Sequence, residues 1–87
     1  MTKVEQDIPL EVAAKKYFSM ALQAEGFSLS TVSITVETTS DGVATCSATD
    51  ALSKKPVAHA TYQDSYLRMT ALLIGQYLVS VNTVYIH

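Results

Sequence analysis

The chain lacks most of the features by which a small functional domain is recognised from its sequence. It has a single cysteine, Cys46, which excludes an intrachain disulfide framework and suits a reducing compartment. Its longest apolar run, Ala71 to Ile74, is far shorter than the roughly 20 residues of a membrane span. The first twelve residues have no apolar core of signal-peptide length. We therefore expect a cytoplasmic protein that does not contact the membrane.

Basic charge and metal-binding side chains are also scarce. Six Lys and Arg stand against eight Asp and Glu, a net charge of −2, whereas nucleic-acid binding relies on neutralised phosphates. One Cys, two His and dispersed carboxylates do not supply three or four converging metal ligands. The three glycines are isolated, so no phosphate-binding loop is present. We predict no metal, no cofactor and no enzymatic activity.

What is present is the composition of one globular domain. The chain has 87 residues, of which 48% are hydrophobic, and it shows no repeat or interdomain linker. We assign residues 1–87 to a single domain, with residues 1–6 as a loose N-terminal end and residues 82–87 as a C-terminal tail.

A hairpin between Thr31 and Asp50 is the clearest pattern. Apolar residues alternate with polar ones on both sides of Ser40-Asp41-Gly42: Val32, Ile34 and Val36 before it, and Ala44, Cys46 and Ala48 after it. A three-residue loop with Gly42 at positive φ places Val36 opposite Cys46, which aligns the apolar faces. A two-residue loop would pair Val36 with Ser47 instead.

Two helices are expected to flank the strands. The first runs from an Asp7 N-cap to Glu25 and ends at Gly26, with Phe27 folding back. The second runs from Gln63 to Val81, after a capping-box-like Thr61 and Asp64. The apolar side of the first helix is predicted to comprise Leu10, Ala13, Ala14, Tyr17, Met20, Ala21 and Ala24.

A third strand, Val57 to Tyr62, completes a meander whose small residues share one face. That face comprises Ala44, Cys46, Ala48, Ala58, Ala60 and Tyr62. The opposite face comprises Ser33, Thr35, Glu37, Thr45, Ser47, Thr49, His59 and Thr61.

The predicted fold class is therefore α+β, in the order α-β-β-β-α, with both helices on one face of a three-stranded antiparallel sheet. The tail Thr83 to Ile86 is able to add a short C-terminal strand. Across about residues 8–81 this order resembles the topology of double-stranded-RNA-binding domains. The resemblance implies a lysine cluster at the start of the last helix and a histidine in the first hairpin loop. Here those positions read Gln63 to Arg68 and Ser40-Asp41-Gly42, so no RNA-binding residue is carried over.

Two further arrangements have both a structural and a functional interpretation. Cys46 and His59 could form a nucleophile and base, but the register places them on opposite faces, so we interpret Cys46 as a core residue. Tyr62 and Tyr66 bracket the junction of strand and helix, as core aromatics or as the wall of a small-ligand pocket.

The expected function is that of a small non-catalytic interaction or accessory protein, a homodimer that acts through an unidentified protein partner. The second helix is more apolar than one sheet face can cover, which suggests an interface containing Leu72, Val79, Val84 and Ile86. Two alternatives remain open. One is a nucleic-acid-binding module of double-stranded-RNA-binding-like shape, and the other is a small-ligand binder or enzyme with a pocket near Tyr62 and Tyr66.

Overall fold

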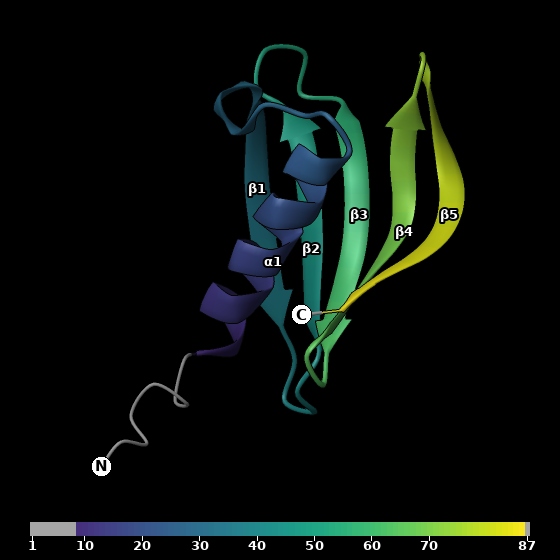
Figure 1. Cartoon of the computed structure of the whole chain (residues 1–87). Coiled ribbons are helices and arrows are strands. Elements are labelled where there is room, and N and C mark those ends of the chain that lie inside the picture. The colour runs from purple at the N-terminus through teal and green to yellow at the C-terminus, as the bar shows by residue number, and fades with distance from the viewer. Residues whose placement is uncertain (1–8, 87) are drawn as a thin grey trace.

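The computed structural model describes residues 9–86, which form one α-helix packed on a five-stranded antiparallel sheet (Figure 1). The elements are α1 (Leu10–Ala24), the short 3₁₀ helix η2 (Leu29–Thr31), β1 (Val32–Thr38), β2 (Ala44–Asp50), β3 (Pro56–Gln63), β4 (Tyr66–Ile74) and β5 (Tyr77–Ile86). The strand order is β1-β2-β3-β4-β5, so every strand pairs with its neighbour in sequence. Among residues 9–86, no helix combines the length and apolar character needed to cross a membrane.

This architecture corrects the predicted fold class. The domain is α+β, but it has five strands and one helix instead of three strands and two helices. The segment from Gln63 to Val81 is extended and belongs largely to β4 and β5. Without the second helix, the topology of a double-stranded-RNA-binding domain is absent.

Two tight turns explain why this segment forms strands. Asp64 and Ser65 both have positive φ, 52° and 68°, which is the backbone of a type I′ hairpin turn between β3 and β4. Gly75 has a φ of 66° at the first position of the two-residue turn between Ile74 and Tyr77. Asp64 is therefore a turn residue and not a helix cap.

β4 and β5 are longer than β1 and β2, at nine and ten residues against seven, and a register shift bends the sheet between β3 and β4. From the pair Ala60–Met69 to the pair His59–Ala71, β4 advances two residues while β3 advances one. Thr70 is the additional residue, and its Oγ1 donates a hydrogen bond to the His59 carbonyl oxygen at 3.2 Å. Register shifts of this kind increase strand twist and curvature. β4 and β5 accordingly curve away from the plane of β1 and β2 (Figure 1).

The β1–β2 hairpin confirms the prediction made for it. Val36 pairs with Cys46 and Ile34 with Ala48. The Thr39 amide donates to the Val43 carbonyl at 2.9 Å, which closes the loop around Ser40-Asp41-Gly42. Gly42 has a φ of 85°.

Replacement of Gly42 by alanine should lower the free energy of unfolding by about 1 kcal/mol, because an L side chain is strained at this φ. An added Cβ would contact nothing within 4 Å, so the expected loss is due to the backbone alone. Gly42→Asn should lose less, since Asn tolerates the left-handed region. Urea denaturation measures both, and an alanine variant as stable as the wild type would contradict the loop conformation.

The first helix ends as predicted and packs with a different face. Gly26 has a φ of 96°, and the Phe27 amide donates to the Leu22 carbonyl at 3.0 Å, as in a Schellman motif. The helix starts at Leu10, and the predicted cap Asp7 lies outside the described residues. Phe18 and Leu22, which the sequence interpretation left off the packed face, are completely buried, whereas Met20, placed on it, is 51% exposed.

The core lies between α1 and the sheet. It comprises Ala14, Phe18, Ala21, Leu22, Ala44, Cys46, Ala48, Val57, Ala58, Ala60, Tyr62, Leu67, Met69 and Leu72. The small residues of β2 and β3 share one face of the sheet, as their alternation predicted, and α1 packs on that face. On the opposite face, the predicted polar residues of β1–β3 are exposed or half-buried.

Candidate interaction surface

The β4–β5 hairpin carries most of the exposed apolar side chains among the described residues. Six of the nine large hydrophobic residues that are exposed lie on these two strands: Tyr66, Ile74, Tyr77, Leu78, Val79 and Val84. We call these six residues the hairpin patch. Tyr77 is the most exposed of them, at 73%. Scattered apolar residues are normal on a surface, but a cluster on one hairpin points to an interaction site.

The patch occupies both faces of the hairpin. Val79 pairs with Leu72, a core residue, and therefore lies on the helix side of the sheet. Tyr77 lies two residues from Val79 on β5, and Ile74 lies two residues from Leu72 on β4, so both lie on the same side. Leu78 pairs with Leu73 and Val84 with Arg68, on the other face.

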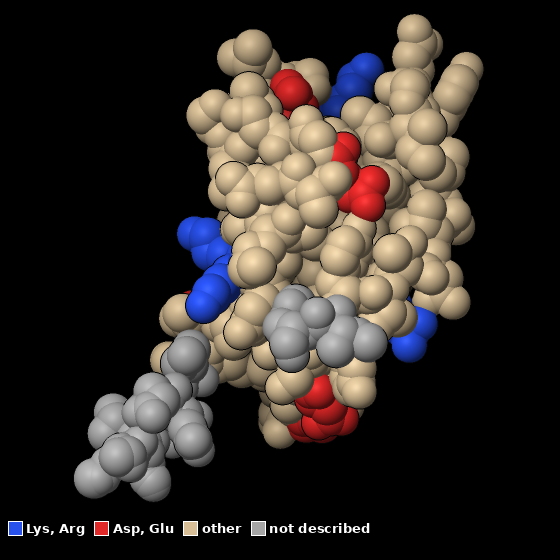
Figure 2. All heavy atoms as spheres, in the orientation of Figure 1, with Lys and Arg blue, Asp and Glu red and all other residues tan. Residues whose placement is uncertain are grey.

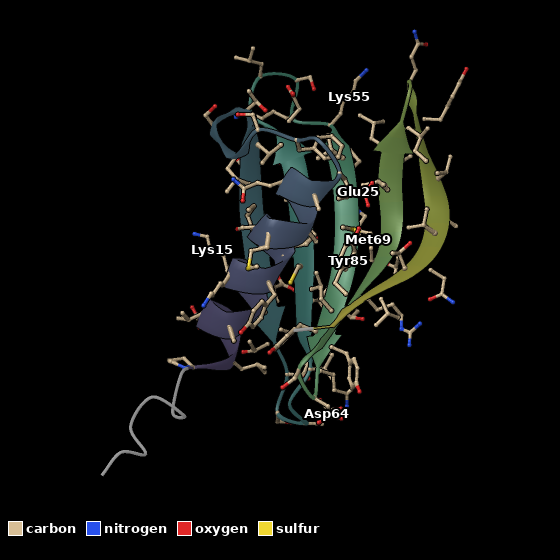
Figure 3. The ribbon with its side chains drawn as sticks, in the orientation of Figure 1. Lys15, Glu25, Lys55, Asp64, Met69 and Tyr85 are labelled. Carbon is tan, nitrogen blue, oxygen red and sulfur yellow. The ribbon has the colours of Figure 1, made fainter. Side chains whose placement is uncertain are left out.

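These residues are exposed because α1 is too narrow to cover five strands. The helix lies mainly over β1 and β2, and β4 and β5 extend beyond it in Figure 1. One side chain of β5 contacts the end of the helix. The Tyr85 hydroxyl donates a hydrogen bond to Glu25, which lies just beyond the end of α1. The two side chains point toward one another in Figure 3. This hydrogen bond connects the end of α1 to β5, while the apolar side chains of the hairpin patch stay exposed to solvent.

The Tyr85–Glu25 contact predicts a specific alkaline pH dependence. Burial, the hydrogen bond to Glu25 and the Glu25 charge together raise the pKa of Tyr85 to about 12, from 10.0. Because the folded pKa is above the unfolded value, this stabilisation is complete below pH 10 and is lost as the pH rises toward 12.

Urea denaturation of wild type and Tyr85→Phe at several pH values measures this effect. The stability difference between them should shrink between pH 10 and 12, while other titrating groups cancel in the comparison. A constant difference over this range would show that the hydroxyl is not held by Glu25.

The hairpin is also nearly free of charge. Arg68 is the one charged residue between Tyr66 and Ile86, and its guanidinium donates to the Asn82 side-chain oxygen at 2.5 Å across the two strands. Figure 2 shows the surface over β4 and β5 as mostly uncharged, in contrast to the lysines beside α1. An uncharged surface favours an apolar partner over nucleic acid.

The four residues predicted to form an interface differ in their exposure to solvent. Val79 and Val84 are 36% and 38% exposed and belong to the hairpin patch. Leu72 is only 8% exposed and is part of the core, so a charge placed there would disrupt folding and not an interface. Ile86 pairs with Tyr66 through its backbone, and its side chain lies outside the described residues.

Cys46 and His59 lie on opposite faces of the sheet, as their register predicted. The thiol is buried, and its Sγ lies 4.0 Å from the Ala14 carbonyl oxygen of α1. The His59 Nδ1 instead lies 3.2 Å from the Ser47 hydroxyl, on the polar face. Among the described residues no carboxylate bonds to His59, so this Ser–His pair lacks the third group that orients a catalytic base.

Tyr62 and Tyr66 do not share a pocket. Tyr62 is in the core and stacks on Tyr17, with ring centroids 5.7 Å apart, whereas Tyr66 is half-exposed on the other face.

A depression of about 590 Å³ lies at the end of the sheet that carries the β2–β3 loop and the β4–β5 turn. It is lined by Asp50, Ser53, Lys55, Pro56, Val57, Leu73, Gln76 and Leu78. Hydrogen bonds from the Ser53 and Leu52 amides hold the Asp50 carboxylate and lower its pKa. None of the polar residues around this depression is buried, so it lacks the enclosed polar group that orients a small ligand.

No group of three His, Cys, Asp or Glu side chains within residues 9–86 could hold a metal ion. Searches of protein-family models, curated proteins and solved structures gave no match to this chain.

Proposed function

We propose that this protein is a small, non-catalytic protein-interaction domain whose binding surface is the hairpin patch. The observation that carries the proposal is the concentration of six exposed large hydrophobic residues on β4 and β5, beyond the cover of the single helix. The near absence of charge on the hairpin supports it further, since interface centres are depleted of charged residues. A cytoplasmic location stays a prediction from the single reduced thiol.

The double-stranded-RNA-binding alternative loses its basis with the three-stranded topology on which it rested. The small-ligand alternative loses its predicted pocket, because Tyr62 and Tyr66 lie on opposite faces. The hairpin patch thus has the strongest support among the candidate surfaces.

Site-specific photo-crosslinking tests the proposal. A photoreactive phenylalanine replaces Tyr77 in one variant and Glu37, an exposed residue of β1, in the matched control. Irradiation of the purified protein, alone and in extract of the source organism, should give an identified cross-linked protein from position 77 and little from position 37. Tyr77→Arg should weaken binding of that identified protein at least tenfold, and equal yields from both positions would refute the proposal.

A further inference from the structure

The open edge of β5 has a sequence that matches itself. We infer that the β5 residues of the hairpin patch bind a second copy of this chain, with the two β5 strands paired antiparallel about a two-fold axis at Val81. This inference rests on the proposed function and names the partner. Within the described residues no strand lies beyond β5, so alternate residues of this ten-residue strand direct unpaired main-chain groups outward.

The residues from Tyr77 to Tyr85 read YLVSVNTVY, a near-palindrome in residue type. When Val81 lies opposite its own copy, antiparallel pairing sets similar residues beside one another in three pairs: Tyr77 with Tyr85, Leu78 with Val84, and Ser80 with Asn82. In the fourth pair, Val79 and Thr83 differ in polarity but are both β-branched. Directly opposite residues share a face of the sheet, so each of these pairs is in side-chain contact. Aromatic residues meet aromatic ones, and polar residues meet polar ones.

Neighbouring two-fold registers lose this match. An axis at Asn82 would place Ser80 opposite Val84, and an axis at Ser80 would place Leu78 opposite Asn82. The Val81 axis is the register in which the exposed apolar residues Leu78 and Val84 cover one another.

The chemistry of the edge favours a copy of the same chain. β5 contains no charged residue and no proline, two of the devices by which natural sheets keep their edges from pairing. Self-pairing therefore brings no like charges together. The one irregularity of β5 is a register shift against β4, which advances two residues from Met69 to Ala71 while β5 advances three from Thr83 to Ser80. The other edge strand, β1, carries Glu37 and none of the large exposed hydrophobic residues found among residues 9–86.

The expected contact is modest in size. Nine paired residues span about 30 Å along the strands, and the contact lies at or below the roughly 800 Å² per partner of a standard interface. A dimer of this size is expected to form at tens to hundreds of micromolar. It would create a continuous ten-strand sheet with one helix from each copy, which places Tyr77 and Val79 against the partner.

Light scattering after size exclusion, over tens to hundreds of micromolar, tests the association. The expected mass rises from the 9.4 kDa of one chain toward twice that value. A mass that stays at one chain throughout overturns the inference. Photo-crosslinking at position 77 to a different protein would then leave the proposed function standing, so the two failures are distinguishable.

A pair of charged variants tests the register. Leu78→Lys with Val84→Lys places like charges opposite one another across the axis and should abolish the dimer. Leu78→Lys with Val84→Glu places opposite charges there and should retain it. Both positions are 38% exposed, and circular dichroism confirms that both variants fold. Equal association by the two folded variants overturns the Val81 axis.

Discussion

Phe18→Ala should lower the free energy of unfolding by about 3–5 kcal/mol. Phe18 is the largest completely buried side chain and projects from the one helix that covers the sheet. Its loss would leave a cavity between α1 and the small residues of β2 and β3, which have no long side chains to fill it. A domain of this size is stable by about 5–10 kcal/mol, so the variant should lose a large share of its stability.

Met20→Ala is the matched control, because it removes a long apolar side chain from the exposed side of the same helix. It should change stability by less than about 0.5 kcal/mol. Urea denaturation followed by circular dichroism measures both variants. If Met20→Ala is the more destabilising change, the helix packs through the face first predicted from the sequence and not through Phe18.

Cys46 should react with a small alkylating reagent at least a hundredfold more slowly in the native protein than in denaturant. Burial raises the pKa of the thiol to about 11, from 9.0. At pH 8 the reactive thiolate fraction then falls from about one in ten to about one in a thousand. The lack of solvent access adds to this, since Cys46 has no exposed surface.

A labelling time course with and without denaturant checks this expectation, and rapid native labelling would contradict the observed register of β1 and β2.

The shift in the pKa of Cys46 also predicts an effect on the free energy of unfolding. Since the folded pKa exceeds the unfolded one, stability is unaffected below pH 9 and falls as the pH rises toward 11. Cys46→Ala should remove this fall.

Cys46→Ser should lower the free energy of unfolding by about 1–3 kcal/mol, because it places a hydroxyl in an apolar site. Sulfur lies 4.0 Å from the Ala14 carbonyl oxygen, and the shorter bonds of serine hold its oxygen back from that acceptor. Comparison with Cys46→Ala separates the cost of the hydroxyl from the loss of volume.

The candidate site could be predicted only in part. An excess of apolar residues in the expected second helix suggested an interface at Val79, and a strand-like tail suggested one at Val84; both side chains are exposed, and their role in an interface stays a prediction. The sequence could not assign them to the edge of a sheet, because that required knowing that β5 is the last strand. Leu72 was misplaced for the same reason, since its burial depends on pairing with Ala58 of β3.

By itself, the sequence determined the first half of the sheet. In β1 and β2 the alternation is uninterrupted and the turn contains the glycine it needs, so one register alone places the alternating apolar residues of both strands on the same face. Gly26 likewise marked the end of the helix through its left-handed conformation.

Only the tertiary structure decided the second half. In β4 the buried residues Leu67, Met69 and Leu72 are spaced by two and then three because Thr70 is an additional residue, which breaks the strand period and imitates a helix. Leu73 and Leu78 on the far face add to the ambiguity, because apolar residues then occur on both sides of the hairpin. Hydrogen bonding to the free edge of β3 resolves it, since main-chain pairing with a neighbouring strand is a long-range interaction that local periodicity does not encode.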